Sequence, residues 1–137
     1  MNLYTFEVYT PYRLFFKEPV AVVVLTLPDG EIGIYAGHAP FTAPVCTGIL
    51  KIQDMKGRWR EAFTAEGILE VTHHKTILLA DAAEWPEEID YERALLAKER
   101  AEERMKSTNF RFEADRAHAT LKRAEFRIKV YGMGRPQ

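Results

Sequence analysis

A pattern that occurs twice in the second half of the chain constrains its fold most. The first copy runs RALLAKERAEER from Arg93 to Arg104, and the second runs RAHATLKRAEFR from Arg116 to Arg127. At about 100° per residue, the three arginines of each copy fall on one face of a helix. The pattern therefore predicts two helices with one arginine stripe each, formed by Arg93, Arg100 and Arg104 and by Arg116, Arg123 and Arg127.

An apolar seam runs beside each arginine stripe. The seam residues are Ala94, Ala97 and Ala101 in the first copy and Ala117, Leu121, Ala124 and Ile128 in the second. Alanines let two helix backbones approach closely, and the short link at 107–109 makes the packing antiparallel. Both arginine stripes are then expected on the same side of a helical hairpin.

The residues before Trp85-Pro86 have a different pattern, because short β-branched or alternating runs are separated by turns. Examples are the alternating run at 4–8, the β-branched run at 20–27 and the turn Pro28-Asp29-Gly30 that follows it. Short strands at regular spacing indicate a sandwich or flattened barrel. We therefore expect an α+β protein with a β-sandwich domain at 1–85 and a helical hairpin at 86–137.

Charge follows the same division. Residues 1–85 hold seven Lys/Arg against ten Asp/Glu, whereas residues 86–137 hold twelve against ten. The overall net charge of −1 therefore conceals a basic surplus in the hairpin. No apolar run approaches the roughly 20 residues that span a bilayer, so we expect no direct membrane insertion.

No pattern of an enzyme is present. The chain has no Gly-rich phosphate loop and no nucleophile motif, and Cys46 is the single cysteine. The neighbours His73 and His74 would point apart in a strand, and we expect them at a hairpin turn rather than on a metal. We therefore predict a non-catalytic protein that holds no metal.

The arginine stripes admit two interpretations. They are either solvated helix faces with intrahelical ion pairs such as Arg100 with Glu103, or a site for an anion. Like charges at i,i+4, as in Arg100/Arg104 and Arg123/Arg127, cost about 0.2–0.5 kcal/mol each. This cost favours an anionic partner, which could be a triphosphate, an acidic protein loop or nucleic acid. Asp90 is expected to cap the first helix, and a carboxylate there could also orient Arg93.

A second unusual stretch, GEIGIYAGHAP, runs from Gly30 to Pro40. Three glycines and a proline in this stretch predict tight turns at a rim of the sandwich. We expect these turns to present Glu31 and His38.

Together these motifs resemble the epsilon subunit of F-type ATP synthases. The Gly30–Pro40 stretch is similar to that family's Gly-Glu-Leu-Gly-Ile-Leu-x-Gly-His-x-Pro, and 89–94 resembles its Ile/Leu-Asp-x-x-Arg-Ala motif. The resemblance covers essentially the whole chain. It implies a β-sandwich of about ten strands, a helical hairpin, and a peripheral place at the cytoplasmic face of the plasma membrane. The implied role is a central-stalk subunit that couples the c-subunit ring to the catalytic head and restrains ATP hydrolysis.

The resemblance also implies partners for both regions. Glu31 and His38 would contact the gamma subunit and the c-subunit ring. The hairpin would meet acidic loops of the catalytic beta subunits when extended, and would bind ATP as a regulatory ligand when folded. The ATP contacts carried over from the family are Glu84, Ile89, Asp90, Arg93, Ala94, Arg100, Arg116, Arg123 and Arg127.

Two other classes of protein remain to be weighed. A helical-hairpin factor that inserts into another large enzyme, such as RNA polymerase, would carry acidic residues at its tip, yet 106–111 holds no carboxylate. A nucleic-acid-binding module is disfavoured by the negative overall charge.

Overall fold

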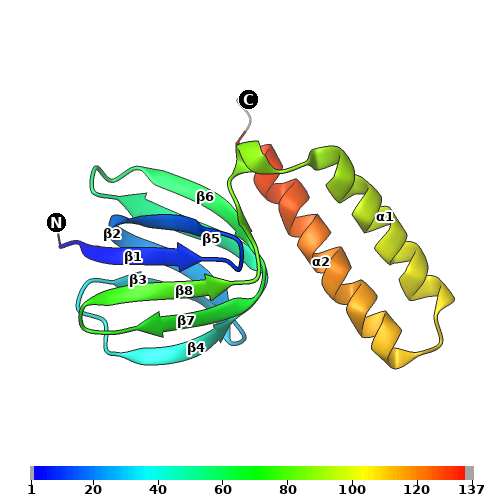
Figure 1. Ribbon diagram of the computed structural model, residues 1–137, viewed down its shortest axis with the longest axis horizontal. Helices are drawn as coiled ribbons and strands as arrows, with labels where there is room; N and C mark the ends of the chain where they lie inside the picture. Colours follow the sequence, from blue (N-terminus) through cyan, green and yellow to red (C-terminus); the bar gives the residue numbers. More distant parts are fainter. Residues whose placement is uncertain (1, 135–137) are drawn as a thin grey trace. The chain divides into compact units, whose positions relative to one another are not determined.

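The computed structural model describes residues 2–134, and the chain divides after Glu84 into two compact units. Residues 2–84 of the first unit form nine strands in one sheet, in the order β4-β7-β8-β1-β2-β5-β6-β9, with β3 paired to β2 (Figure 1). The strands are β1 (Tyr4–Tyr9), β2 (Leu14–Leu27), β3 (Gly30–Tyr35), β4 (Phe41–Val45), β5 (Gly48–Asp54), β6 (Trp59–Thr64), β7 (Gly67–Val71), β8 (Lys75–Ala80) and β9 (Ala83–Glu84).

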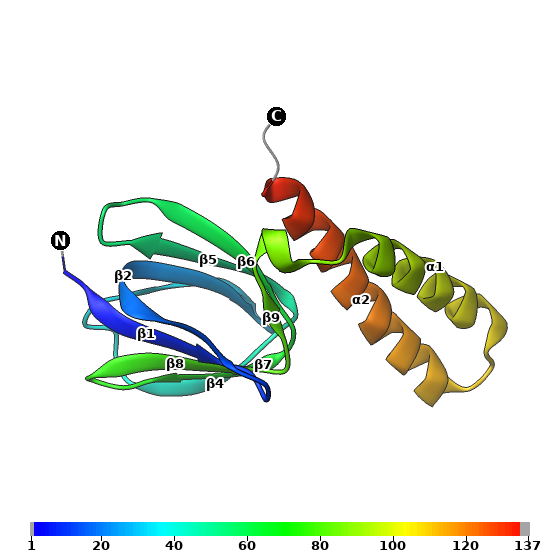
Figure 2. The same cartoon turned by 45° about the horizontal axis from the view of Figure 1, so that its top comes forward.

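The long strand β2 folds this sheet into two facing layers. Its first part pairs with β1, and its later residues pair with β5 on one edge and β3 on the other, with a register shift between Val20 and Val22. The layer of β4, β7 and β8 therefore faces the layer of β5 and β6 (Figure 2). At one end the Cys46 amide donates to the Thr26 carbonyl at 2.8 Å and ties the end of β4 to β2. The unit is the expected β-sandwich.

Large apolar side chains fill the space between the layers, because strand alternation turns every second residue inward. The fully buried members include Phe6, Val8, Leu25, Ile34, Leu50, Phe63, Leu69 and Leu78. Gly67 shows how closely β7 and β8 approach. A Cβ there would overlap the carbonyl of Leu79, so a side chain at this position requires the backbones to separate.

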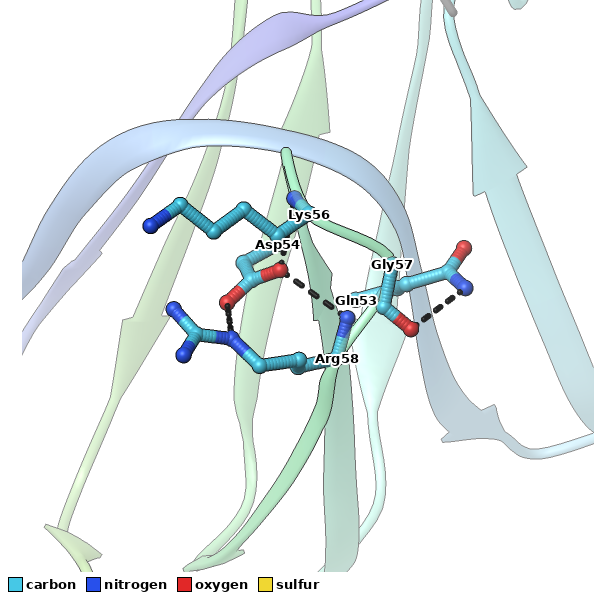
Figure 3. Close-up of polar contacts among 5 residues, drawn as sticks. All are labelled: Gln53, Asp54, Lys56, Gly57 and Arg58. Carbon is cyan, nitrogen blue, oxygen red and sulfur yellow. Dashed lines mark hydrogen bonds and ion pairs between the residues drawn. The ribbon is translucent and has the colours of Figure 1, made fainter.

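Polar groups order the turns between strands. In the β5–β6 turn, Asp54 accepts hydrogen bonds from the backbone amides of Lys56 and Arg58 and from the Arg58 guanidinium at 3.1 Å (Figure 3). These bonds, led by the Arg58 amide, lower the pKa of the Asp54 carboxyl. Gly57, at φ 80°, completes the turn. His73 and His74 lie between β7 and β8, as expected for a hairpin turn.

The second unit is a hairpin of two helices, α1 (Tyr91–Ser107) and α2 (Arg111–Met133), preceded by the 3₁₀ turn η1 (Pro86–Glu88). The helices lie side by side and are joined by a link of three residues (Figure 1). The α+β class, with a sandwich followed by two helices, is therefore confirmed. Residues 135–137, which the predicted hairpin domain includes, lie outside the described residues.

Candidate functional site

The start of α1 is fixed by a side-chain cap. Asp90 adopts an extended conformation and its Oδ1 accepts a hydrogen bond from the Arg93 amide at 3.1 Å. One turn earlier, Glu88 Oε1 accepts from the Trp85 amide at 2.9 Å. Asp90 thus satisfies one of the amide donors that a helix start leaves without a partner, as the sequence predicts.

Alanines form the contact between the two helices. Ala94 and Ala101 on α1, and Ala117 and Ala124 on α2, are each at most 4% exposed. Each arginine stripe lies about 100° to the same rotational side of its own alanine row. In an antiparallel pair this geometry places both stripes on one side of the hairpin, which we call the basic face.

A groove of about 300 Å³ runs along the basic face. Arg93, Arg100 and Arg104 line it from α1, and Ala117 and Thr120 line it from α2. The volume lies at the lower end of the range for small-molecule sites. Three guanidinium groups beside one groove offer many hydrogen-bond donors and no acceptor, which suits a phosphate or carboxylate.

The arginines of α2 occupy two environments. The guanidinium of Arg116 lies 5.8 Å from the ring centre of Phe112, and Arg116 shares with Arg104 a concavity of about 520 Å³ at the hairpin tip. Arg123 is partly buried, and burial together with the positive charge of Arg127 lowers its pKa. The cost of holding Arg123 charged would fall if an anion lay against this pair.

Three of the predicted ATP contacts are not among the exposed side chains of the basic face. Ala94 is 4% exposed within the helix seam, and Ile89 is 6% exposed just before α1. These two side chains serve packing inside the hairpin and present almost no surface to a ligand. Glu84 ends β9, in the other unit.

Sequence reasoning missed some residues that line the groove. Thr120 and Leu96 belong to it, although neither is in an arginine stripe. Arg104 was recognised in the stripe but is absent from the contacts carried over from the family. Around the axis of α2, Thr120 lies between the alanine seam and the arginine stripe. Its angular position alone could therefore have identified it as a residue that lines the groove.

The rim stretch holds two tight turns, one at each end of β3. Gly30 and Gly37 have positive φ angles of 131° and 82°, as tight turns require. Glu31 lies at the start of β3 and His38 lies beyond its end, so no single turn carries both. At about 3.3 Å per residue, the strand separates Glu31 from Tyr35 by about 13 Å, and the His38 amide then donates to the Tyr35 carbonyl in the following turn. Gly33 lies within β3, between the two turns, and each turn has one of the two polar residues beside it.

His38 belongs to a small polar cavity at its end of β3. Its ring lies 5.1 Å from that of Phe41, and it lines a space of about 110 Å³ with His73 and His74 of the β7–β8 turn and Lys75 at the start of β8. Among residues 2–134, no three His, Cys, Asp or Glu side chains are grouped so that they could hold a metal ion. Within the same range, neither helix has the length and apolar character needed to cross a membrane.

A β-sandwich followed by a basic helical hairpin defines the class of this protein. Residues 3–86 match the beta-sandwich domain of the ATP synthase Delta/Epsilon chain, and residues 87–132 match the long alpha-helix domain of the same chain. The chain belongs to the ATP synthase delta/epsilon chain family.

Relatives and solved structures agree with this assignment. The chain is 50% identical over 130 residues to an ATP synthase epsilon chain of Caldicellulosiruptor bescii, covering 95% of this chain and 94% of the relative. It is 41% identical over 130 residues to that of Ruminiclostridium cellulolyticum, covering 95% and 96%. It resembles a chain in the Euglena gracilis mitochondrial ATP synthase (OSCP/F1/c-ring) with a TM-score of 0.78 and 22% identity, covering 90% of this chain and 78% of that one. The structural likeness shows the shared fold.

Proposed function

We propose that this protein is the epsilon subunit in the central stalk of an F-type ATP synthase. It would have no catalytic role of its own and would couple the c-subunit ring to the catalytic head. The observation that carries the proposal is the agreement of both domains, in order and over nearly the full length, with bacterial epsilon chains. The complex would hold the protein peripherally at the cytoplasmic face of the plasma membrane, without direct insertion.

The hairpin is proposed as the regulatory element. Its basic face would take either the triphosphate of ATP or acidic loops of the beta subunits, because both are anions that suit the same guanidinium groups. Occupation by ATP would stabilise the folded hairpin, and occupation by beta-subunit loops would stabilise an inhibitory, extended one. ATP would act as a ligand that is not hydrolysed.

Within the hairpin, five residues of the predicted ATP set remain our proposed ligand contacts: Arg93, Arg100, Arg116, Arg123 and Arg127. Asp90 would act by capping α1 and so fixing the backbone that carries Arg93. The placement of Ile89 and Ala94 favours a packing role for both side chains, since each is at most 6% exposed.

Glu31 and His38 are proposed as contacts to the gamma subunit and the c-subunit ring. Because they lie at opposite ends of β3, one partner surface would have to extend along the whole strand to reach both. Two separate contacts, one at each end, would satisfy the same proposal. Cross-linking from Glu31→Cys and His38→Cys in the assembled complex distinguishes these arrangements by the subunit captured at each position.

Calorimetric titration of the full chain with ATP tests the nucleotide part. We expect saturable binding that weakens at least about tenfold in Arg100→Gln, which removes a charge-assisted contact. Lys122→Gln is the matched control, because it removes one positive charge from α2 at an exposed position outside the stripes. Absence of binding by the unsubstituted chain at millimolar ATP would refute this part.

The regulatory part is tested by the ATPase activity of the assembled complex with and without residues 86–137. Inhibition by the hairpin predicts higher hydrolysis after truncation, and equal activity would contradict it. Co-purification separates the proposal from its alternative. The tagged protein should bring down alpha, beta and gamma subunits, whereas a channel-inserting factor would bring down RNA polymerase.

A further inference from the structure

Two tyrosines that are far apart in the sequence meet at the base of the hairpin. Tyr91 is the first residue of α1 and Tyr131 lies near the end of α2. Their rings are stacked, with centroids 4.6 Å apart and planes inclined by 22°. This contact joins the first turn of α1 to the last turns of α2.

The surroundings of the stack at the base of the hairpin are well buried. Val130, next to Tyr131, is fully buried, and Ile89 is 6% exposed. A Cβ at Gly134 would overlap Pro86, so the end of α2 also lies directly against η1. At the tip, by contrast, Phe110 and Phe112 are 71% and 72% exposed.

The stacked pair sits next to the proposed ligand contacts. Asp90 precedes Tyr91 directly and caps α1 through the amide of Arg93, so one turn of helix carries the cap, the stacked ring and the first arginine of the groove. A force that holds Tyr91 against α2 therefore also holds Arg93 in its place on the basic face.

We propose that Tyr91 and Tyr131 are positioning residues for the basic face. Their stack holds the helices together at the base and keeps Arg93 in register with the α2 arginines for a nucleoside triphosphate. This inference rests on the proposed nucleotide-responsive hairpin and specifies how its closed state is maintained. Aromatic pairs add to stability beyond the area they bury, whereas alanine contacts bury little area.

The fraction of molecules with a closed hairpin links the tyrosine stack to the affinity for ATP. If only the closed hairpin binds ATP, the apparent dissociation constant rises in inverse proportion to the closed fraction. Loss of an aromatic pair changes the equilibrium constant between the closed and the open hairpin by about two- to tenfold. We therefore expect Tyr131→Ala to weaken ATP binding by up to about that factor without touching an arginine.

The experiment measures the distance between the helices directly. In full-length protein carrying Cys46→Ser, spin labels are placed at Glu92→Cys and Lys129→Cys, two exposed positions near the base. Without nucleotide, Tyr131→Ala should give a longer and broader distance distribution than Tyr131, and Tyr131→Phe should restore the original one. Met133→Ala, which removes a 42% exposed side chain from the same end of α2, should leave the distribution unchanged.

The same variants are then titrated with ATP. Retained affinity of Tyr131→Ala, or an unchanged distance distribution, would overturn the inference. If circular dichroism shows that Tyr131→Ala loses helix, Tyr131→Leu serves instead, since it keeps apolar volume and removes only the ring. Failure of the unsubstituted chain to bind ATP would refute the proposed function and the nucleotide half of this inference together, while the nucleotide-free distances still decide whether the stack holds the helices.

Discussion

The sandwich and the hairpin are held together by different kinds of side chain. The sandwich buries phenylalanines, leucines and isoleucines between its layers, whereas the seam of the hairpin buries alanines. Burial of a large apolar side chain contributes about 1.5–3 kcal/mol, and an alanine contributes far less. The comparison indicates a scaffold held by extensive apolar burial in one unit and a hairpin held by much less burial per contact in the other.

The sandwich and the hairpin also differ in how their charged side chains are paired. In the sandwich, buried Glu7 is paired with Lys75 at 3.3 Å, and Asp54 is paired with Arg58. In the hairpin, positive charges stand beside one another, as at Arg100 and Arg104, which line one groove. The sandwich thus pairs these charges internally, whereas the basic face brings like charges together and is the surface proposed above to bind an external anion.

The largest effect is expected from a cavity in the sandwich. Phe63→Ala, at a fully buried position, should lower the free energy of unfolding by about 3–5 kcal/mol, because both apolar transfer energy and packing are lost. Urea denaturation followed by circular dichroism measures it. An effect no larger than that of an exposed substitution such as Phe110→Ala would contradict the contrast drawn between the units.

Overpacking the helix seam should have the next largest effect. Ala124 is 1% exposed between the helices, so Ala124→Leu should cost about 1–3 kcal/mol and force the helices apart. Ala119→Leu, at an exposed position of the same helix, is the control and should be nearly neutral. The loss of helical signal on denaturation reports on this change. Equal stability of the two variants would show that the alanines do not set the helix spacing.

A smaller effect on stability, confined to acidic pH, is expected from substitution of Glu7. The Tyr9 hydroxyl donates to Glu7 at 2.6 Å and, with Lys75, lowers the pKa of the carboxyl below 4.5. A depressed folded-state pKa adds stability above the unfolded-state pKa and loses it as the pH falls through the folded value. Glu7→Gln should therefore flatten the fall of the melting temperature between neutral pH and about pH 3.

Exposed Glu70→Gln is the control for this acid effect and should leave the slope unchanged. A melting temperature of Glu7→Gln that falls with acid as steeply as that of the unsubstituted protein would show that another carboxyl dominates the acid dependence.

Local patterns predicted the strands whose residues are β-branched or alternate, but missed two stretches that contain proline. The first part of β2, around Pro19, and all of β4, around Pro44, are strands. Neither stretch is a clear alternating or β-branched run, and proline also removes a ladder donor. β4 tolerates it because it is an edge strand, and β2 because its pairing shifts from β1 to β5 near this position. Such compensation depends on tertiary neighbours that a local pattern does not contain.

In the candidate site too, local sequence patterns predict some features and miss others. Helical periodicity was sufficient for the alanine seam, and capping chemistry for Asp90. The Tyr91–Tyr131 stack could not be found, because it joins residues forty positions apart whose types fit many roles. Glycine also identified the turns of the rim stretch, because Gly30 and Gly37 have positive φ angles at the two ends of β3.

The smallest expected effect concerns the repulsion inside the basic face. Arg100→Gln removes a like charge from its i,i+4 neighbour Arg104, so at low salt it should raise the stability of the hairpin by about 0.2–0.5 kcal/mol. The gain should disappear near 1 M salt, where charges are screened within about 3 Å. Lys122→Gln should show no such gain, and thermal denaturation at two salt concentrations measures both variants. A variant that becomes more stable while losing affinity for ATP would show that the hairpin gives up stability to hold an anion. Lower stability of Arg100→Gln at low salt would instead mean that intrahelical ion pairs, such as one with Glu103, dominate this face.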